Sequence, residues 1–176
     1  MANPGFLKLE GMQQAVIQSS VNSDDKEGMI QFFTFEHKLD AQAKPKEDRA
    51  DAQHKHNPQK HNPHKHKPIV ITKETDKFTP ALYKALCSGE QIKTAKFSWF
   101  ATLGSKNEEQ QVYSVTIDKA KIIAIETSMP DTRETAEGHI NLSEKITFAY
   151  EKITWAYDQD ESTSYKDKSN MADCSN

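Results

Sequence analysis

Apolar residues return at every second position in several short stretches of this chain. Tyr113, Val115 and Ile117 alternate with polar neighbours, and Ile69 and Ile71 begin a β-branched run. A period of two is typical of strands with one face on a core and the other in water. The pattern predicts strands over residues 6–9, 29–37, 69–73, 91–101, 111–118, 120–127 and 146–157, with a hairpin partner for the first strand over 15–19.

The stretch 29–37 is apolar on both sides of the expected strand. Phe33 and Phe35 fall on one face, and Ile30 and Phe32 fall on the other. Both faces are therefore expected to contact apolar groups.

Near the C-terminus the alternation changes phase. Ile146, Phe148 and Tyr150 keep a period of two, whereas the next apolar set begins at Ile153. A β-bulge at residues 151–152 would place both sets on one face, because one extra residue restores the side. Many short strands of this kind indicate a β-barrel or a β-sandwich, and the alternation does not distinguish the two.

One segment has helical spacing. Leu82, Ala85 and Leu86 fall at i, i+3 and i+4, so they share one face of a helix. Pro80 suits the first helical position, and Gly89 suits the position after the last turn. These signals predict one short α-helix at about residues 79–88.

The residues before this helix carry polar groups. Thr79 offers its hydroxyl as an N-cap, and Asp76 precedes the positive end of the helix dipole. A carboxylate there stabilises a helix by about 0.3–1 kcal/mol. A structural role is expected for Asp76, whereas for Lys77 a structural role and a subunit contact both stay open.

Composition limits the organisation of the chain. Of its 176 residues, 35% are hydrophobic and 28% are charged. We expect one domain at residues 1–157, with an inserted basic loop at 38–68, and an acidic, flexible tail at 158–176. A membrane-spanning helix needs about 18 consecutive apolar residues, which the sequence lacks, and the N-terminus has no signal-peptide pattern. We expect synthesis in the cytoplasm, with Cys87 and Cys174 as free thiols.

The net charge of −3 conceals an uneven distribution. Residues 38–68 hold eight basic and four acidic side chains, whereas residues 158–176 have a net charge of −3. Opposite charges on two segments indicate contact within a subunit or between copies, with two solvated, mobile segments as the alternative. A chain of this small net charge gives no reason to expect nucleic acid as a partner.

Five of the seven histidines lie within thirteen residues. They are His54, His56, His61, His64 and His66. Lysines and two Asn-Pro pairs lie between them, and the Asn-Pro pairs disfavour helix and strand. Three interpretations compete: a Zn, Ni or Cu site, a contact that tightens when the imidazoles are protonated, and a flexible basic loop. Because the spacing fits no closed metal site and the lysines oppose a cation, no metal or other cofactor is expected.

No motif of a known catalytic class occurs in the sequence. The nucleophile elbow, the zinc-protease histidine pair, the redox cysteine pair and the phosphate-binding loop are all missing. His37 is expected at the end of a strand and His139 in a loop, both as surface histidines. The sequence predicts a protein that is not an enzyme.

Three blocks of the sequence match a known pattern in the right order. The central block, residues 68–90, reads PIVITKETDKFTPALYKALCSGE; residues 146–155 read ITFAYEKITW, and residues 7–11 read LKLEG. In these blocks the chain resembles the Hcp (hemolysin-coregulated protein) family, which forms the inner tube of type VI secretion systems. The chain departs from the family after Tyr157, where its tail lacks the usual tryptophan.

The resemblance implies a closed antiparallel β-barrel with one short helix and a long extended loop. It further implies six-fold rings that stack head to tail into a hollow tube, which a contracting sheath expels with effectors. The implied partners are copies of the chain itself, the sheath, the tip protein and effectors, without nucleic acid or membrane insertion. Export would then proceed without a signal peptide, to the extracellular space or a target cell.

The long loop is the part of the family fold that engages the adjoining ring. The residues expected at ring-stacking or subunit contacts are His54, His56, His61, His64, His66, Lys67 and Lys77. The alternative function is a monomeric β-barrel that binds a metal ion through the same five histidines. Tight, stoichiometric binding of Zn or Ni would distinguish this alternative from a ring-forming protein.

Overall fold

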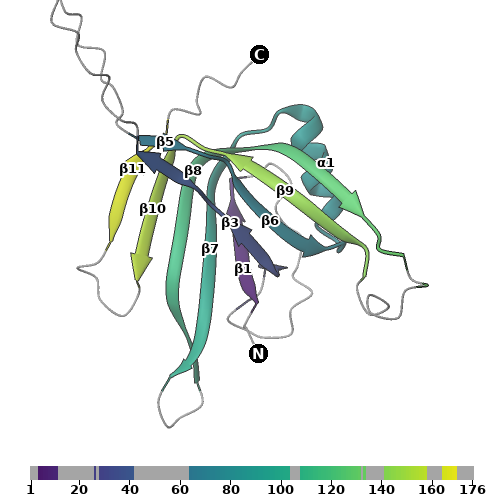
Figure 1. The fold of residues 1–176 in the computed structure, drawn as a ribbon, viewed down its shortest axis with the longest axis horizontal. Coiled ribbons are helices and arrows are strands. Elements are labelled where there is room, and N and C mark those ends of the chain that lie inside the picture. Colours follow the sequence, from purple (N-terminus) through teal and green to yellow (C-terminus); the bar gives the residue numbers. More distant parts are fainter. Residues whose placement is uncertain are drawn as a thin grey trace, which may run out of the picture.

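The computed structural model describes residues 4–11, 26, 28–41, 64–103, 108–131, 133, 141–157 and 164–169. This part of the chain forms eleven strands and one short helix (Figure 1). The mainly β fold with a single helix confirms the prediction from sequence. The predicted hairpin partner at 15–19 and most of the loop 38–68 lie outside the described residues.

Nine strands form one antiparallel sheet. Its path runs β2–β1–β7–β8–β9–β6–β3, and β10 and β11 extend it from β8. These nine strands are β1 (Gly5–Glu10), β2 (Ile30–Phe32), β3 (Thr34–Glu36), β6 (Ile69–Glu74), β7 (Ile92–Leu103), β8 (Glu108–Ser128), β9 (Ser143–Ala149), β10 (Lys152–Tyr157) and β11 (Tyr165–Lys168). A separate two-stranded hairpin joins β4 (Leu39–Ala41) to β5 (His64–His66).

The first large apolar stretch is two strands rather than one. β2 pairs with β1 and β3 pairs with β6, while the intervening Phe33 donates its backbone N–H to the carbonyl of Thr72 (2.8 Å). Phe33 is 55% exposed, whereas Phe32 is buried and its ring lies 6.2 Å from that of Phe35. The prediction that Phe33 and Phe35 share a face is therefore wrong, because the break at Phe33 turns Phe35 towards the core.

Strand β8 spans 21 residues and replaces two predicted strands. The chain bends at Lys119, which has a positive φ of 52°, without leaving the sheet. Before the bend β8 pairs with β10, and after it β8 pairs with β9. A left-handed residue within a strand changes its direction, which explains the interruption of the apolar alternation at this point.

The predicted phase change near residue 151 is confirmed, but a one-sided bulge does not cause it. Ala149 pairs with Lys121 and Lys152 pairs with Asp118, so equal numbers of residues separate these pairs on the two strands. The change of phase between β9 and β10 is therefore matched by a change of phase in their common partner β8, at the bend. The side chain of Tyr150, in the gap between β9 and β10, stays buried.

The helix α1 (Thr79–Ser88) has the predicted bounds. Leu82 and Ala85 are buried in the core, and full burial of a leucine contributes about 1.5–3 kcal/mol of transfer free energy. Tyr83 Oη lies 2.6 Å from Thr127 Oγ1, which places α1 against the second half of β8. Gly89 ends the helix as predicted, in a left-handed conformation with φ 64°.

The predicted cap at the start of the helix is wrong. Phe78 is the N-cap residue, and no side chain caps this end. The Thr79 hydroxyl instead accepts from the backbone N–H of Asp76 (3.1 Å) and donates to Glu144 (3.0 Å). Because Asp76 Oδ1 accepts from the N–H of Phe78 (2.9 Å), a turn before the helix takes up the polar groups.

Part of the acidic C-terminal segment is a strand rather than a flexible tail. Tyr165–Lys168 forms β11, which pairs with β10 along four residue pairs from Trp155–Tyr165 to Lys152–Lys168. Ser169 then donates its backbone N–H to the carbonyl of Glu151 (2.8 Å). Within the described residues, the one helix is too short and too polar to cross a membrane.

Candidate functional site: the base of the histidine-rich hairpin

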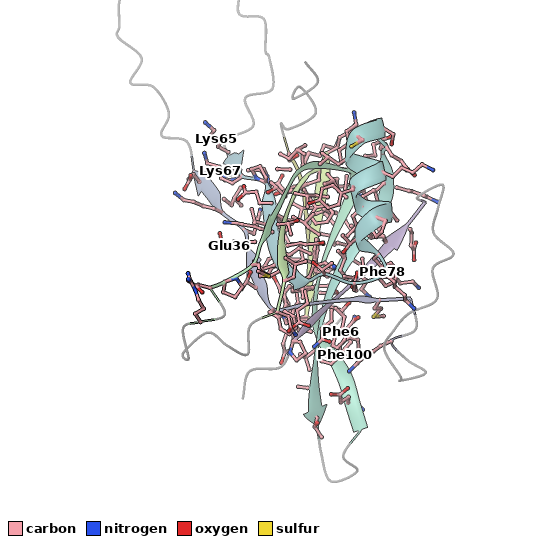
Figure 2. All side chains as sticks on the ribbon, turned by 90° about the vertical axis from the view of Figure 1, so that its right-hand side faces the viewer. Phe6, Glu36, Lys65, Lys67, Phe78 and Phe100 are labelled. Carbon is pink, nitrogen blue, oxygen red and sulfur yellow. The ribbon has the colours of Figure 1, made fainter. Side chains whose placement is uncertain are left out.

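The hairpin β4–β5 carries residues 42–63 between its strands and is the base of the histidine-rich segment. Leu39 pairs with His66 and Ala41 with His64, and the N–H of Lys67 donates to the carbonyl of Lys38 (2.9 Å). Alternation along β5 turns His66 inward and leaves Lys65 exposed. The side chains of Lys65 and Lys67 lie at the same edge of the molecule (Figure 2).

His66 is the buried residue of this hairpin, with 5% of its surface exposed. Its Nδ1 lies 3.3 Å from Tyr150 Oη, and its Nε2 lies 3.2 Å from Asp167 Oδ2. Both ring nitrogens therefore have a polar partner, one from the gap between β9 and β10 and one from β11. The imidazole connects three segments that are far apart in the sequence.

Tyr150 lies at the centre of this histidine cluster, which comprises His37, His66, Tyr150, Trp155 and Asp167. Tyr150 Oη is 2.7 Å from His37 Nε2, and it donates to the carbonyl of Lys67 (3.3 Å). Burial, and then the negative charge of Asp167, raise the pKa of Tyr150 well above its usual value. The phenol therefore stays protonated at physiological pH and serves as a neutral donor and acceptor.

His37 is a member of this cluster and is partly buried, not the plain surface residue that the sequence suggested. Burial lowers its pKa from 6.5, and the charge of the nearby His66 lowers it further. The two imidazole centroids are 6.2 Å apart, close enough that a positive charge on one disfavours a charge on the other. A positive charge on His66 therefore opposes protonation of His37.

Trp155 covers the cluster from β10. Its ring is stacked on His66 (centroids 6.4 Å apart, planes at 19°) and on Tyr165 of β11 (5.8 Å and 18°). Tryptophan in such an arrangement adds apolar contact area and shields the polar pairs from water. Next to the cluster, an open hollow of about 480 Å³ is lined by His37, Lys38 and Lys67, among others.

The residues predicted to form ring contacts fall into three groups. His64, His66 and Lys67 lie together at the hairpin. Lys77 lies apart from them, exposed before α1, with its Nζ 5.9 Å from the Phe78 ring centroid. His54, His56 and His61 are outside the described residues. Among the residues that are described, no three His, Cys, Asp or Glu side chains are grouped so as to hold a metal ion.

A second polar cluster, which the sequence interpretation missed, lies at the start of the helix. Lys73 is fully buried, and its Nζ lies 2.9 Å from Asp76 Oδ1 and 3.3 Å from the buried Glu144 Oε2. Thr75 and Thr79 donate their hydroxyls to Glu144 (3.1 and 3.0 Å). The alternation of buried and exposed positions could have revealed the burial of Lys73, because this residue follows Ile69 and Ile71 on the inward face of the strand. Its partner is 71 residues away, which no local pattern reveals.

Comparison with known proteins gives a consistent result. The family model described as "Type VI secretion system effector, Hcp" matches residues 6–157. The "Major exported protein" of Pseudomonas aeruginosa is 27% identical over 167 residues, which cover 90% of this chain and 91% of the relative. A crystal structure of an Hcp protein with 24% identity matches with a TM-score of 0.73, covering 94% of this chain and 96% of that one.

A further solved structure is a variant of the Hcp1 protein from the E. coli EAEC 042 pathovar. It is 28% identical, with a TM-score of 0.73, and the match covers 95% of this chain and 99% of that chain. The fold and the span of the family model define a β-sheet protein of the type VI secretion class. The chain belongs to the Hcp family.

Proposed function

We propose that this chain is the tube subunit of a type VI secretion system. In this proposal six copies form a ring, the rings stack head to tail, and the resulting hollow tube carries effectors when a sheath expels it. The role is structural rather than catalytic. The observation that carries the proposal is the family match over residues 6–157, which includes nearly all of the folded strands.

We infer that the sheet closes into a barrel. The two ends of the sheet path, β2 and β3, follow each other in the chain and are separated by Phe33 alone. The N–H of Phe33 bonds to Thr72 on β6, while β2 pairs with β1. A continuous segment that joins both ends of a sheet supports closure, and a closed barrel has the rigidity that a repeating tube unit requires.

Ring formation needs two different surface patches that match each other. A heterologous contact of this type closes into a ring when the rotation between copies is right. We propose that His54, His56, His61, His64, Lys67 and Lys77 contribute to contacts within or between rings. The side chain of His66 is buried. It would therefore contribute to ring contacts indirectly, by holding the hairpin in place.

Export and partners follow from the same proposal. The Pseudomonas aeruginosa relative is named an exported protein. We propose that the present chain is likewise made in the cytoplasm and exported without a signal peptide, with the sheath, the tip protein and effectors as partners.

The test is the absolute mass of the untagged protein in solution, measured by size-exclusion chromatography with light scattering. A mass of six subunits supports the ring, and higher multiples of six support stacking. A monomer over the whole concentration range, up to about 100 μM, would contradict the proposed self-assembly. Negative-stain images of the peak fraction check that the oligomer is a closed ring.

A further inference from the structure

The C-terminal strand β11 is held to the body of the protein by side chains as well as by its pairing with β10. Asp167 alternates with Lys166 and Lys168, so its carboxylate faces His66 while the two lysines project from the other side of the strand. Tyr165 stacks on Trp155, and the Ser169 hydroxyl donates to the carbonyl of Tyr150. The His66–Asp167 contact therefore joins β11 to the β4–β5 hairpin.

We propose that His66 is a positioning residue that clasps β11 to the β4–β5 hairpin, and that the clasp tightens when the imidazole gains its second proton. A neutral imidazole has one N–H, so it can donate to Asp167 or to Tyr150 but not to both. The imidazolium donates to both at once, and its bond to the Asp167 carboxylate becomes charge-assisted, which makes such bonds roughly twice as strong.

The other titratable groups that face His66 leave this response intact. Tyr150 remains neutral, since burial and the Asp167 charge raise its pKa. His37 favours its neutral form, since burial and His66 lower its pKa. Asp167 itself is the single carboxylate that contacts the imidazole among the described residues. A second proton on His66 therefore places a positive charge opposite a carboxylate.

The consequence for function rests on the proposed tube assembly. The hairpin is the base of the segment expected to contact the next ring, and the clasp fixes the position of the hairpin on the body of the protein. Ordering of the C-terminal strand and orientation of the hairpin then depend on one another. Strand β11 of the C-terminal segment thus helps to position the hairpin.

The test is amide hydrogen exchange of the peptides that contain β11 and β5, at pH 5.5 and pH 8.0, corrected for the intrinsic rate. In the wild type we expect β11 to exchange about three- to tenfold more slowly at pH 5.5. Asp167→Asn keeps the shape but removes the charge, and it should abolish this difference. His66→Phe keeps the ring on Trp155 without any N–H and should abolish it as well.

Asp40→Asn is the matched control, because Asp40 lies on the same hairpin and pairs with the exposed Lys38 (3.2 Å). It should behave as the wild type. A pH difference that persists in Asp167→Asn, or β11 exchange that neither variant alters, would overturn the clasp. The mass of the wild-type assembly, measured on the same samples, tests the proposed function separately: a monomeric wild type removes the tube and leaves the exchange result standing.

Discussion

At the scale of single residues, the most demanding feature is a charged ammonium group inside the core. Burial of a lysine is costly unless opposite charges and hydrogen bonds surround it. Lys73 has two carboxylates within 3.3 Å, and its Nζ also donates to the carbonyl of Glu74. Glu144, which is only 1% exposed, has three donors in turn. Each member of the cluster therefore depends on the others.

Replacement of Lys73 by Met should lower the free energy of unfolding by about 3–5 kcal/mol, because Glu144 is left as an unpaired buried charge. The double variant Lys73→Met/Glu144→Gln should recover part of this loss, since it removes the charge as well. Lys84→Met, on the exposed side of α1, is the control and should stay within about 0.5 kcal/mol of the wild type. Urea denaturation measures all three. Equal losses in the single and double variants would show that the charge is not the cause.

His37 gives a stability that depends on pH. The pKa of His37 in the folded state lies below its ordinary value of 6.5. At a pH between the folded-state pKa and 6.5, the unfolded chain therefore binds more protons than the folded one. The contribution of His37 to stability is therefore present above pH 6.5 and decreases as the pH falls towards the folded pKa. The difference in unfolding free energy between the wild type and His37→Gln should shrink over this window. A difference that is constant from pH 8 to pH 5 would contradict this assignment.

At the scale of elements, sequence predicts best where the deciding contacts are local. The helix at 79–88 and strands such as β6 follow from spacing within six to ten residues, and both are confirmed. Three features depend instead on partners elsewhere in the chain: the break at Phe33, the bend at Lys119 and the pairing of β10 with β11. His66 combines a local and a non-local effect. Alternation along the strand could predict that its side chain points inward, but only the folded sheet brings Asp167 next to it.

The end of the helix allows a test of one local signal. Gly89 has φ 64°, and a Cβ at this position would meet no atom within 4 Å. The effect of Gly89→Ala is therefore purely a backbone effect, which we expect to cost about 1 kcal/mol. Gly89→Asn should cost less, because asparagine tolerates the left-handed region. Thermal unfolding followed by circular dichroism ranks the stability of the wild type and the two variants. A Gly89→Ala variant as stable as the wild type would show that the left-handed conformation causes no strain.

At the scale of the whole molecule, exposed charged side chains and buried ionic groups lie in different regions of the β-sheet body. Exposed lysines surround the hairpin, whereas the buried ion cluster of Lys73 and Glu144 lies at the start of the helix and is closed to solvent. The hairpin end is the one from which residues 42–63 depart. A contact between copies should therefore be most sensitive to charge at the hairpin and least sensitive in the ion cluster, which acts on folding.

Lys67→Glu tests this separation. Lys67 is exposed, and within the described part of the chain its hydrogen bonds come from its backbone. The substitution should therefore leave the free energy of unfolding within about 0.5 kcal/mol of the wild type. If the hairpin meets an acidic surface of the next ring, the charge reversal should reduce stacking while single rings persist, because like charges repel across the contact. Sedimentation velocity at low and moderate salt measures the distribution of rings and stacks. Lys84→Glu is the matched control, because Lys84 is exposed on α1, and this variant should stack as the wild type does. An equal loss of stacking in both variants would show that net charge causes the effect. It would contradict a role of the hairpin in the ring contact.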